Sequence, residues 1–273
     1  MHEPETSNSF LAWHAWAATD TIAVKLTTIF PDNPASPEPR PGVQAIVIAF
    51  HGVDGSPKAV IDGTELTYWK TAASSGLAAD FLAPREPSTL LMVGAGGLAP
   101  YLVMAHRAIR PSIDRVMVWN RTRAKAEALC VHPLVGESVE VVDDLEAAVA
   151  GSDVISCATA SDRPLIQGEL LQPGAHVDLV GGFTRGMREA DNATIRRARL
   201  FLDSFMFTME DAGDICIPLE AGVIDRSDLV TDLLGLCRGV PGRMSDDEIT
   251  LYKSAGGAHL DLMATKHVLE VLT

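Results

Sequence analysis

The first third of the chain alternates apolar runs with polar breaks in a way that predicts mixed α/β structure. Three runs rich in branched residues predict strands: Ile22–Ile29, Val43–Phe50 and Lys58–Ile61. Residues 31–41 are polar and proline-rich and predict a loop, and residues 52–57 predict a hairpin-like connection. Small and apolar residues then recur at helical spacing over Glu65–Leu82, which predicts a helix packed closely against its neighbours.

In the middle third of the chain, short apolar runs alternate regularly with stretches of helical periodicity. Strands are expected at Thr89–Val93, Val116–Trp119, Val139–Val142, Val154–Cys157, His176–Val180 and Leu200–Leu202. Helices are expected up to Ile109 and over Arg123–Cys130, Leu145–Val149 and Ala190–Ala198. This alternation predicts parallel βαβ units in a doubly wound sheet. From about Gly213 onward we expect helices, one of them opened by a capping box at Ser245–Glu248 and the last over Ala258–Leu272.

Composition and charge narrow the class of protein. A length of 273 residues corresponds to roughly two domains of ~150 residues, or to one large domain. The 47% hydrophobic content excludes a disordered chain. The formal net charge of −14 argues against nucleic acid and against an anionic membrane surface as partners, because both require a basic footprint.

The cellular location and the metal content are predicted from patterns that the sequence lacks. The uncharged stretch Pro87–Ala105 has the length of a membrane span, but prolines and glycines interrupt it. The opening residues show no secretory signal pattern, and the four cysteines are scattered without paired spacing. We therefore expect a cytoplasmic protein with idle thiols. His14, His51, His106 and His259 show no metal-ligand spacing and are expected to be structural, with no metal bound.

A glycine turn provides the first functional motif. Gly94-Ala95-Gly96-Gly97-Leu98-Ala99 lies between a predicted strand and a predicted helix and fits the dinucleotide fingerprint G-x-G-x-x-G/A. In that fingerprint the first glycine permits the tight turn, the second lets the backbone approach a pyrophosphate, and the last small residue keeps the helix close to the sheet. The motif predicts nucleotide binding, with a purely structural turn as the alternative.

The end of the next strand indicates which nicotinamide cofactor is used. An NAD site normally places a carboxylate there for the ribose hydroxyls, but this chain has Asn120-Arg121-Thr122-Arg123. Two guanidinium groups without a carboxylate favour a 2′-phosphate, so NADP(H) is the preferred cofactor and NAD(H) the alternative. In the other interpretation these arginines only cap a solvated helix start.

Several ordered strings resemble those of the ornithine cyclodeaminase/mu-crystallin family. They are Val24-Lys25-Leu26, Phe30-Pro31-Asp32-Asn33, Asp62-Gly63-Thr64-Glu65-Leu66-Thr67, Lys70-Thr71-Ala72-Ala73, the glycine turn with His106, residues 156–161, Gly181-Gly182-Phe183 with Met187-Arg188-Glu189, and Tyr252-Lys253-Ser254-Ala255-Gly256. The resemblance implies a Rossmann doubly wound domain, residues 86–213, inserted into a second α/β domain. That second domain, residues 1–85 and 214–273, would bind substrate and form a homodimer.

The resemblance also implies site residues. Lys25 would contact the substrate carboxylate and the reacting centre, with Lys70 and Thr64 also binding substrate, although Thr64 has a second interpretation as a helix N-cap. Lys25 has no charged neighbour from position 23 to 31, so its ammonium must either snorkel outward or meet an anion. Lys70 replaces the arginine that is usual in the family. Cofactor contacts are implied further at Thr159, Ala160, Gly181, Phe183 and Ala255.

The family includes several activities, and Phe183 separates them. Cyclodeaminases carry an aspartate directly after the paired glycines, and phenylalanine cannot transfer protons. Asp191 and Glu189 are expected to cap the next helix instead. We therefore expect an NADPH-dependent reductase of small cyclic ketimine carboxylates, with a small cyclic imino acid or amino acid as ligand. The alternatives are an ornithine cyclodeaminase or alanine dehydrogenase, or a non-catalytic binding protein resembling mu-crystallin.

Overall fold

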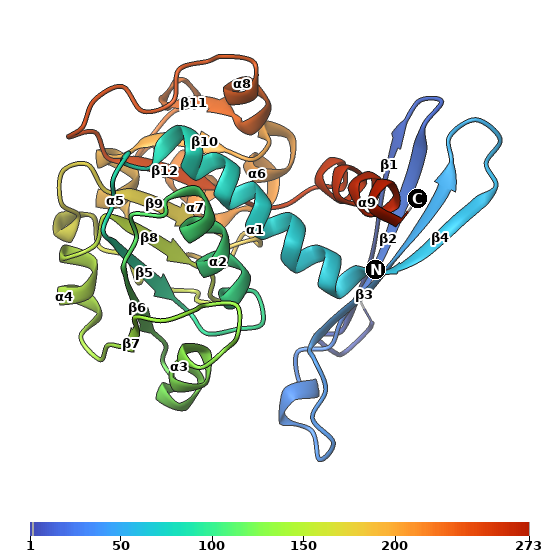
Figure 1. Cartoon of the computed structure of the whole chain (residues 1–273), viewed down its shortest axis with the longest axis horizontal. Coiled ribbons are helices and arrows are strands. Elements are labelled where there is room, and N and C mark those ends of the chain that lie inside the picture. The colour runs from blue at the N-terminus through green and yellow to red at the C-terminus, as the bar shows by residue number, and fades with distance from the viewer. Residues whose placement is uncertain (2, 273) are drawn as a thin grey trace. The chain divides into compact units, whose positions relative to one another are not determined.

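The computed structural model describes residues 1 and 3–272 and divides the chain into two units (Figure 1). One unit comprises Met1–Lys70 and Gly257–Thr273, and the other comprises Thr71–Gly256. The larger unit is continuous in sequence, and it contains the C-terminal half of the helix over residues 63–82 and the strands after position 228. The domain limits expected from the sequence, residues 86–213 within residues 1–85 and 214–273, stay a prediction.

The smaller unit is an antiparallel sheet covered by a helix on one face. Its strand order is β1-β2-β3-β4, with bounds Ser9–Ala17, Thr21–Ile29, Val43–His51 and Pro57–Asp62. A short 3-10 helix, η1 (Asn33–Ala35), lies in the loop before β3. Helix α9 (Ala258–Leu272) packs on β1 and β2, and Leu262 joins Ala23, Val47 and Leu66 in the core (Figure 1). β1 was not among the predicted strands.

Helix α1 (Gly63–Leu82) begins directly after β4 because Asp62 caps it. The Asp62 carboxylate accepts hydrogen bonds from the backbone N–H groups of Thr64 and Glu65, at 2.9 and 3.0 Å. Such a cap satisfies amides that the first turn of a helix leaves unpaired. Asp62, rather than Thr64, is therefore the capping residue.

The larger unit is built on a parallel sheet in the order β11-β10-β12-β9-β8-β5-β6-β7. The strands are β5 (Thr89–Val93), β6 (Arg115–Trp119), β7 (Val139–Val141), β8 (Val154–Cys157), β9 (His176–Leu179), β10 (Arg199–Leu202), β11 (Leu229–Asp232) and β12 (Thr250–Lys253). The chain winds one way from β5 to β7 and the other way from β8 to β9. The order therefore reverses between β5 and β8, the position at which doubly wound sheets bind ligands.

Helices cover both faces of this sheet. They are α2 (Ala99–Ile109), α3 (Arg123–Cys130), α4 (Leu145–Ala150), α5 (Asn192–Arg197), α6 (Phe205–Asp211), α7 (Gly213–Glu220) and α8 (Leu233–Cys237), with η2 (Gly168–Leu170) and η3 (Arg226–Asp228). Residues of α2 and α3 share one apolar core with the sheet, and those of α4, α5 and α7 share another. None of the helices in the described residues has the length and apolarity that crossing a membrane requires.

The structure corrects the expectation of an all-helical segment after Gly213. Strands β11 and β12 lie there, and the Ser245–Glu248 string forms a turn rather than a helix start. The Glu248 carboxylate accepts a hydrogen bond from Met244 N–H at 2.9 Å instead of capping a following helix. The next residues become β12 because their backbone pairs with both β10 and β9, and the side chains of all four residues are buried.

Candidate functional site

The glycine turn has the geometry that a dinucleotide needs. Gly94 has a φ of +103°, and a Cβ there would lie 2.6 Å from the Ala158 carbonyl oxygen, so only glycine fits. By contrast, apart from Gly96 itself and its two neighbours in the chain, no described atom lies within 4 Å of the Cβ position of Gly96, which leaves space for a pyrophosphate. Among the described residues no side chain caps the N-terminus of α2, where backbone N–H groups and the helix dipole favour phosphate.

The two arginines in the segment after β6 differ in whether they form ion pairs. Asn120 fastens the segment to the glycine turn, because its side-chain oxygen accepts a hydrogen bond from Ala95 N–H at 3.1 Å and its amide donates to the Thr122 carbonyl at 2.8 Å. Arg123 forms ion pairs with Glu127, at 2.9 Å, and with Asp143. Arg121 is exposed and has no ion-pair partner within residues 1 and 3–272, so it is the guanidinium available to a phosphate.

A buried carboxylate joins the loops that follow β8 and β9. Glu189 Oε1 accepts hydrogen bonds from the backbone N–H and the hydroxyl of Thr159, at 2.7 and 2.8 Å. Its Oε2 accepts from the N–H groups of Gly181 and Gly182, at 2.7 and 3.3 Å. Burial raises the pKa of Glu189. Two predicted cofactor residues, Thr159 and Gly181, are thus held by one side chain that was expected to cap a helix.

An ion pair lies directly beneath these loops. Lys253 Nζ and Asp214 Oδ2 are 3.1 Å apart, and both side chains are fully buried. The other oxygen of Asp214 accepts hydrogen bonds from the N–H groups of Glu189 and Ala190, at 2.8 and 3.0 Å. A Cβ on Gly182 would lie 2.4 Å from Asp214 Oδ2, so the second glycine of the pair lets the chain pass over the ion pair.

Three further predicted cofactor residues lie in loops. The N–H of Ala255 donates to the buried Asp203 carboxylate at 2.8 Å, which fixes the loop after β12. Ala160 is exposed, and Phe183 is 44% exposed in the loop after β9. Asp191 caps α5 by accepting from Thr194 N–H at 2.7 Å, as expected, although the helix begins at Asn192 rather than Ala190.

In the smaller unit two lysines meet one carboxylate. Lys25 lies on the α9 face of β2, and its Nζ is 2.9 Å from Oδ1 and 2.8 Å from Oδ2 of Asp261. Lys70 Nζ is 3.7 Å from Asp261 Oδ1. All three side chains are largely buried, with exposed fractions of 11%, 5% and 5%. Of the two possibilities for Lys25, its ammonium therefore meets an anion.

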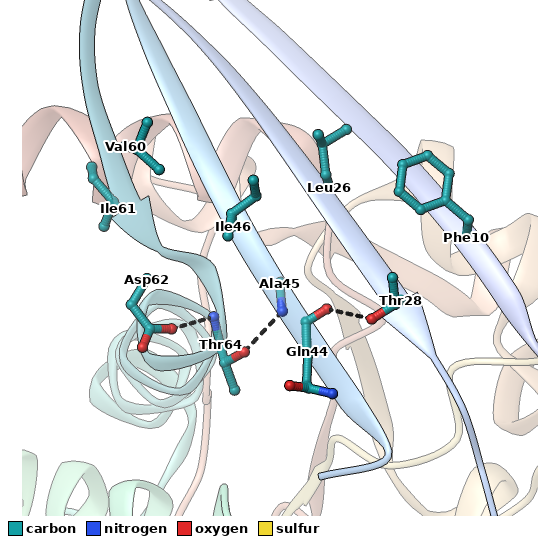
Figure 2. A pocket seen from close by; sticks show the side chains of 10 residues that line it. All are labelled: Phe10, Leu26, Thr28, Gln44, Ala45, Ile46, Val60, Ile61, Asp62 and Thr64. Atoms are coloured by element: carbon teal, nitrogen blue, oxygen red, sulfur yellow. Dashed lines mark hydrogen bonds between the residues drawn. The ribbon is translucent and has the colours of Figure 1, made fainter. Parts of the chain in front are cut away.

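Thr64 lies apart from this cluster within the smaller unit. Its hydroxyl accepts a hydrogen bond from Ala45 N–H at 2.9 Å. It lines a hollow on the sheet together with Phe10, Leu26, Thr28, Gln44, Ala45, Ile46, Val60, Ile61 and Asp62 (Figure 2). Leu26 and Lys25 point to opposite faces of the sheet, because successive side chains of a strand alternate. The hollow is therefore on the face opposite Lys25.

Four residues of these clusters were not predicted as site residues: Glu189, Asp214, Lys253 and Asp261. Asp214, Lys253 and Asp261 are charged residues whose immediate neighbours are apolar or small, the same signal that identified Lys25. Glu189 follows Arg188 directly and gives no such signal. His106 is buried and pairs with Asp178 at 3.0 Å, in keeping with a structural role. Burial acts to raise the pKa of Asp178, but hydrogen bonds from His106 and Ser156 lower it.

Comparison with known proteins decides the family. The family model described as ornithine cyclodeaminase/mu-crystallin family matches residues 9–273. The chain belongs to the ornithine cyclodeaminase/mu-crystallin family. Among its curated relatives, Δ1-pyrroline-2-carboxylate reductase of Paracoccus denitrificans is 39% identical over 269 residues, covering 97% of this chain and 84% of the relative. Protein SAR DEFICIENT 4 of Arabidopsis thaliana is 39% identical over 272 residues, covering 96% and 83%.

Several solved structures share the fold of this chain. Δ1-pyrroline-2-carboxylate reductase of Thermococcus litoralis, in complex with NADH and L-proline, has a TM-score of 0.87 and 28% identity over 96% of this chain and 86% of that one. An archaeal alanine dehydrogenase dimer with bound NAD has a TM-score of 0.86 and 26% identity, covering 96% and 85%. Iminosuccinate reductase of P. denitrificans with NAD+ has a TM-score of 0.87 and 25% identity, covering 100% and 83%.

Proposed function

We propose that this protein is an NADPH-dependent reductase of small cyclic ketimine carboxylates, such as Δ1-pyrroline-2-carboxylate and Δ1-piperideine-2-carboxylate. The observation that carries the proposal is the pair of buried ammonium groups, Lys25 and Lys70, gathered at one carboxylate. Two ammoniums in a largely buried site suit a carboxylate-bearing substrate. The relatives named as reductases of this substrate class support the same conclusion.

The chain's own residues have separate tasks in this reaction. Lys25 and Lys70 bind the substrate carboxylate and thereby orient the carbon of the C=N bond. The glycine turn and the uncapped end of α2 fit the pyrophosphate of a dinucleotide. When bound, the nicotinamide supplies the hydride, and a proton from water completes the reduction of C=N to CH–NH.

Phe183 favours reduction over cyclodeamination. The position after Gly181-Gly182 offers a phenyl ring, which has no proton to exchange. We infer that this ring forms an apolar wall against the nicotinamide. Reduction of an imine suits such a wall, because its nitrogen takes a proton readily from water.

Arg121 supports NADPH as the preferred form of the cofactor. It is the arginine of its segment whose guanidinium carries no ion pair among the described residues, whereas Arg123 is engaged by two carboxylates. No carboxylate stands at the end of β6 to repel a 2′-phosphate. The family structures with NADH or NAD+ support a nicotinamide cofactor as such.

A spectrophotometric assay tests the function. Purified protein is mixed with each imine and with NADPH or NADH, and loss of the reduced nicotinamide absorbance is followed. We expect turnover with at least one imine and a higher kcat/KM with NADPH. No oxidation of either nicotinamide with either imine would refute the proposal, and ammonia release from ornithine with catalytic NAD would select a cyclodeaminase instead.

We also infer that the protein is a homodimer formed through the sheet of the smaller unit. The face opposite α9 carries large exposed apolar side chains, Trp16, Ile46 and Val60, at 66%, 45% and 71% exposure. An apolar face of this kind marks an interface, and the archaeal alanine dehydrogenase is described as a dimer. Analytical ultracentrifugation should give twice the chain mass, and Val60→Glu should shift the protein toward monomer. A monomeric wild-type protein at micromolar concentration would refute the inference.

A further inference from the structure

Asp261 stands between the two lysines that the proposed function assigns to the substrate carboxylate. Both of its oxygens lie within 2.9 Å of Lys25 Nζ, whereas Lys70 Nζ lies 3.7 Å from the nearer oxygen. The first contact is a direct ion pair, and the second is longer than an ordinary hydrogen bond. Asp261 thus fixes the ammonium of Lys25 and attracts that of Lys70 from a short distance.

A carboxylate in this position changes the charge that a substrate meets. Asp261 removes one unit from the positive charge that the two ammoniums present. Because the three side chains are at most 11% exposed, water and salt screen these charges weakly. The same carboxylate that offsets the lysines repels any further anion brought beside them.

We propose that Asp261 is a specificity-determining residue that restricts the site to imines with a single carboxylate. The proposal rests on the proposed function for the assignment of Lys25 and Lys70. One substrate carboxylate is attracted by the lysines, whereas a second carboxylate on the same small molecule would be held close to the Asp261 carboxylate, which repels it. A dicarboxylic imine is therefore disfavoured.

The chain provides a matched control for the structural role of the ion pair. Lys266, on the same helix α9, pairs with Asp20 in the turn between β1 and β2. That second pair also links helix and sheet, but it lies at the surface, with Lys266 34% and Asp20 46% exposed. Asp20→Asn removes a helix–sheet ion pair and leaves the charge beside Lys25 unchanged. Asp261→Asn removes a helix–sheet ion pair and also changes the charge beside Lys25.

The experiment compares wild type, Asp261→Asn and Asp20→Asn with two substrates. Steady-state kcat/KM is measured with Δ1-pyrroline-2-carboxylate, which has one carboxylate, and with iminosuccinate, which has two. We expect Asp261→Asn to shift the ratio toward the dicarboxylate by about tenfold or more, since one buried charge is worth at least that. Asp20→Asn should leave the ratio unchanged. An unchanged ratio in Asp261→Asn, with or without a lower melting temperature, would overturn the proposal.

A binding measurement and a second variant distinguish a failure of this proposal from a failure of the proposed function. If wild type reduces neither imine, the proposed function fails. Calorimetric titration with L-proline and L-aspartate then tests Asp261 by binding alone, with the same expected shift. If Asp261→Asn does not fold, the double variant Lys70→Gln/Asp261→Asn replaces it, because it removes one charge of each sign. The preference for the monocarboxylate should fall in that variant as well, because the carboxylate that repels a second anion is absent, and a preference as strong as in wild type would overturn the proposal.

Discussion

Replacing Lys253 by methionine should destabilise the protein strongly, because the substitution leaves a carboxylate buried without its counter-charge. The two charges are 3.1 Å apart and fully buried. At an effective dielectric constant of about 20, charges at that distance attract by about 5 kcal/mol. Removal of one partner from buried ion pairs typically costs 3–5 kcal/mol. We therefore expect Lys253→Met to lower the free energy of unfolding by about 3–5 kcal/mol.

The pH dependence of the stability loss in Lys253→Met provides a second, independent test of this prediction. Burial already raises the pKa of Glu189, and Lys253 acts against that rise. Without Lys253 the folded-state pKa of Glu189 moves further above its unfolded value. Stability that depends on a protonated carboxyl is fully present below the unfolded pKa and is lost as the pH rises through the folded one. The deficit of Lys253→Met should therefore be larger at pH 8 than at pH 5.

Urea unfolding followed by circular dichroism measures both effects. The control is Lys253→Met/Asp214→Asn, in which the amide oxygen can still accept from the N–H groups of Glu189 and Ala190 while the charge is gone. This double variant should recover most of the lost stability. A single variant as stable as wild type, or a double variant no better than the single one, would refute the electrostatic explanation.

Three further predictions concern the site. Arg121→Asp should shift the ratio of kcat/KM values from NADPH toward NADH. Arg123→Asp should shift this ratio less, because Arg123 already forms ion pairs with two carboxylates. Equal shifts in the two variants would show that the phosphate is not bound at Arg121. Gly94→Ala should lower unfolding free energy by about 1–3 kcal/mol or more and weaken cofactor binding, because its methyl group would meet the Ala158 carbonyl; wild-type melting and affinity would contradict this. Lys25→Ala should raise the KM for the imine or abolish activity while the Kd for NADPH stays constant, and wild-type kinetics would remove Lys25 from the site.

Much of the fold follows from the sequence because local pattern and burial agree. The strands β5 and β8 and the helices α3 and α9 lie where periodicity and turn residues place them. β1 was missed because its residues after Ser9 are all apolar except His14, so no polar–apolar alternation marks a strand; its strand character comes from pairing with β2 along its whole length. β12 was missed because Ser245–Glu248 matches a capping box locally, whereas its place in the sheet depends on partners far away in sequence.

The motifs of the candidate site were predictable from the sequence, but the ion-pair partners of its lysines were not. The glycine turn is contiguous, so the sequence alone indicates its geometry. The partner of Lys25 is Asp261, which is 236 positions away. The partner of Lys253 is Asp214, in a segment for which only helical structure was expected. Such pairs arise from the packing of separate elements, which no local pattern encodes.

The place of β12 in the sheet has a consequence for how the protein is made. β12 is the last strand of the described chain, yet it fills the gap between β10 and β9. A nascent polypeptide therefore carries two open strand edges until residues 250–253 have emerged. We expect fragments that stop before this strand to aggregate, and the growing chain to depend on chaperones until its sheet closes.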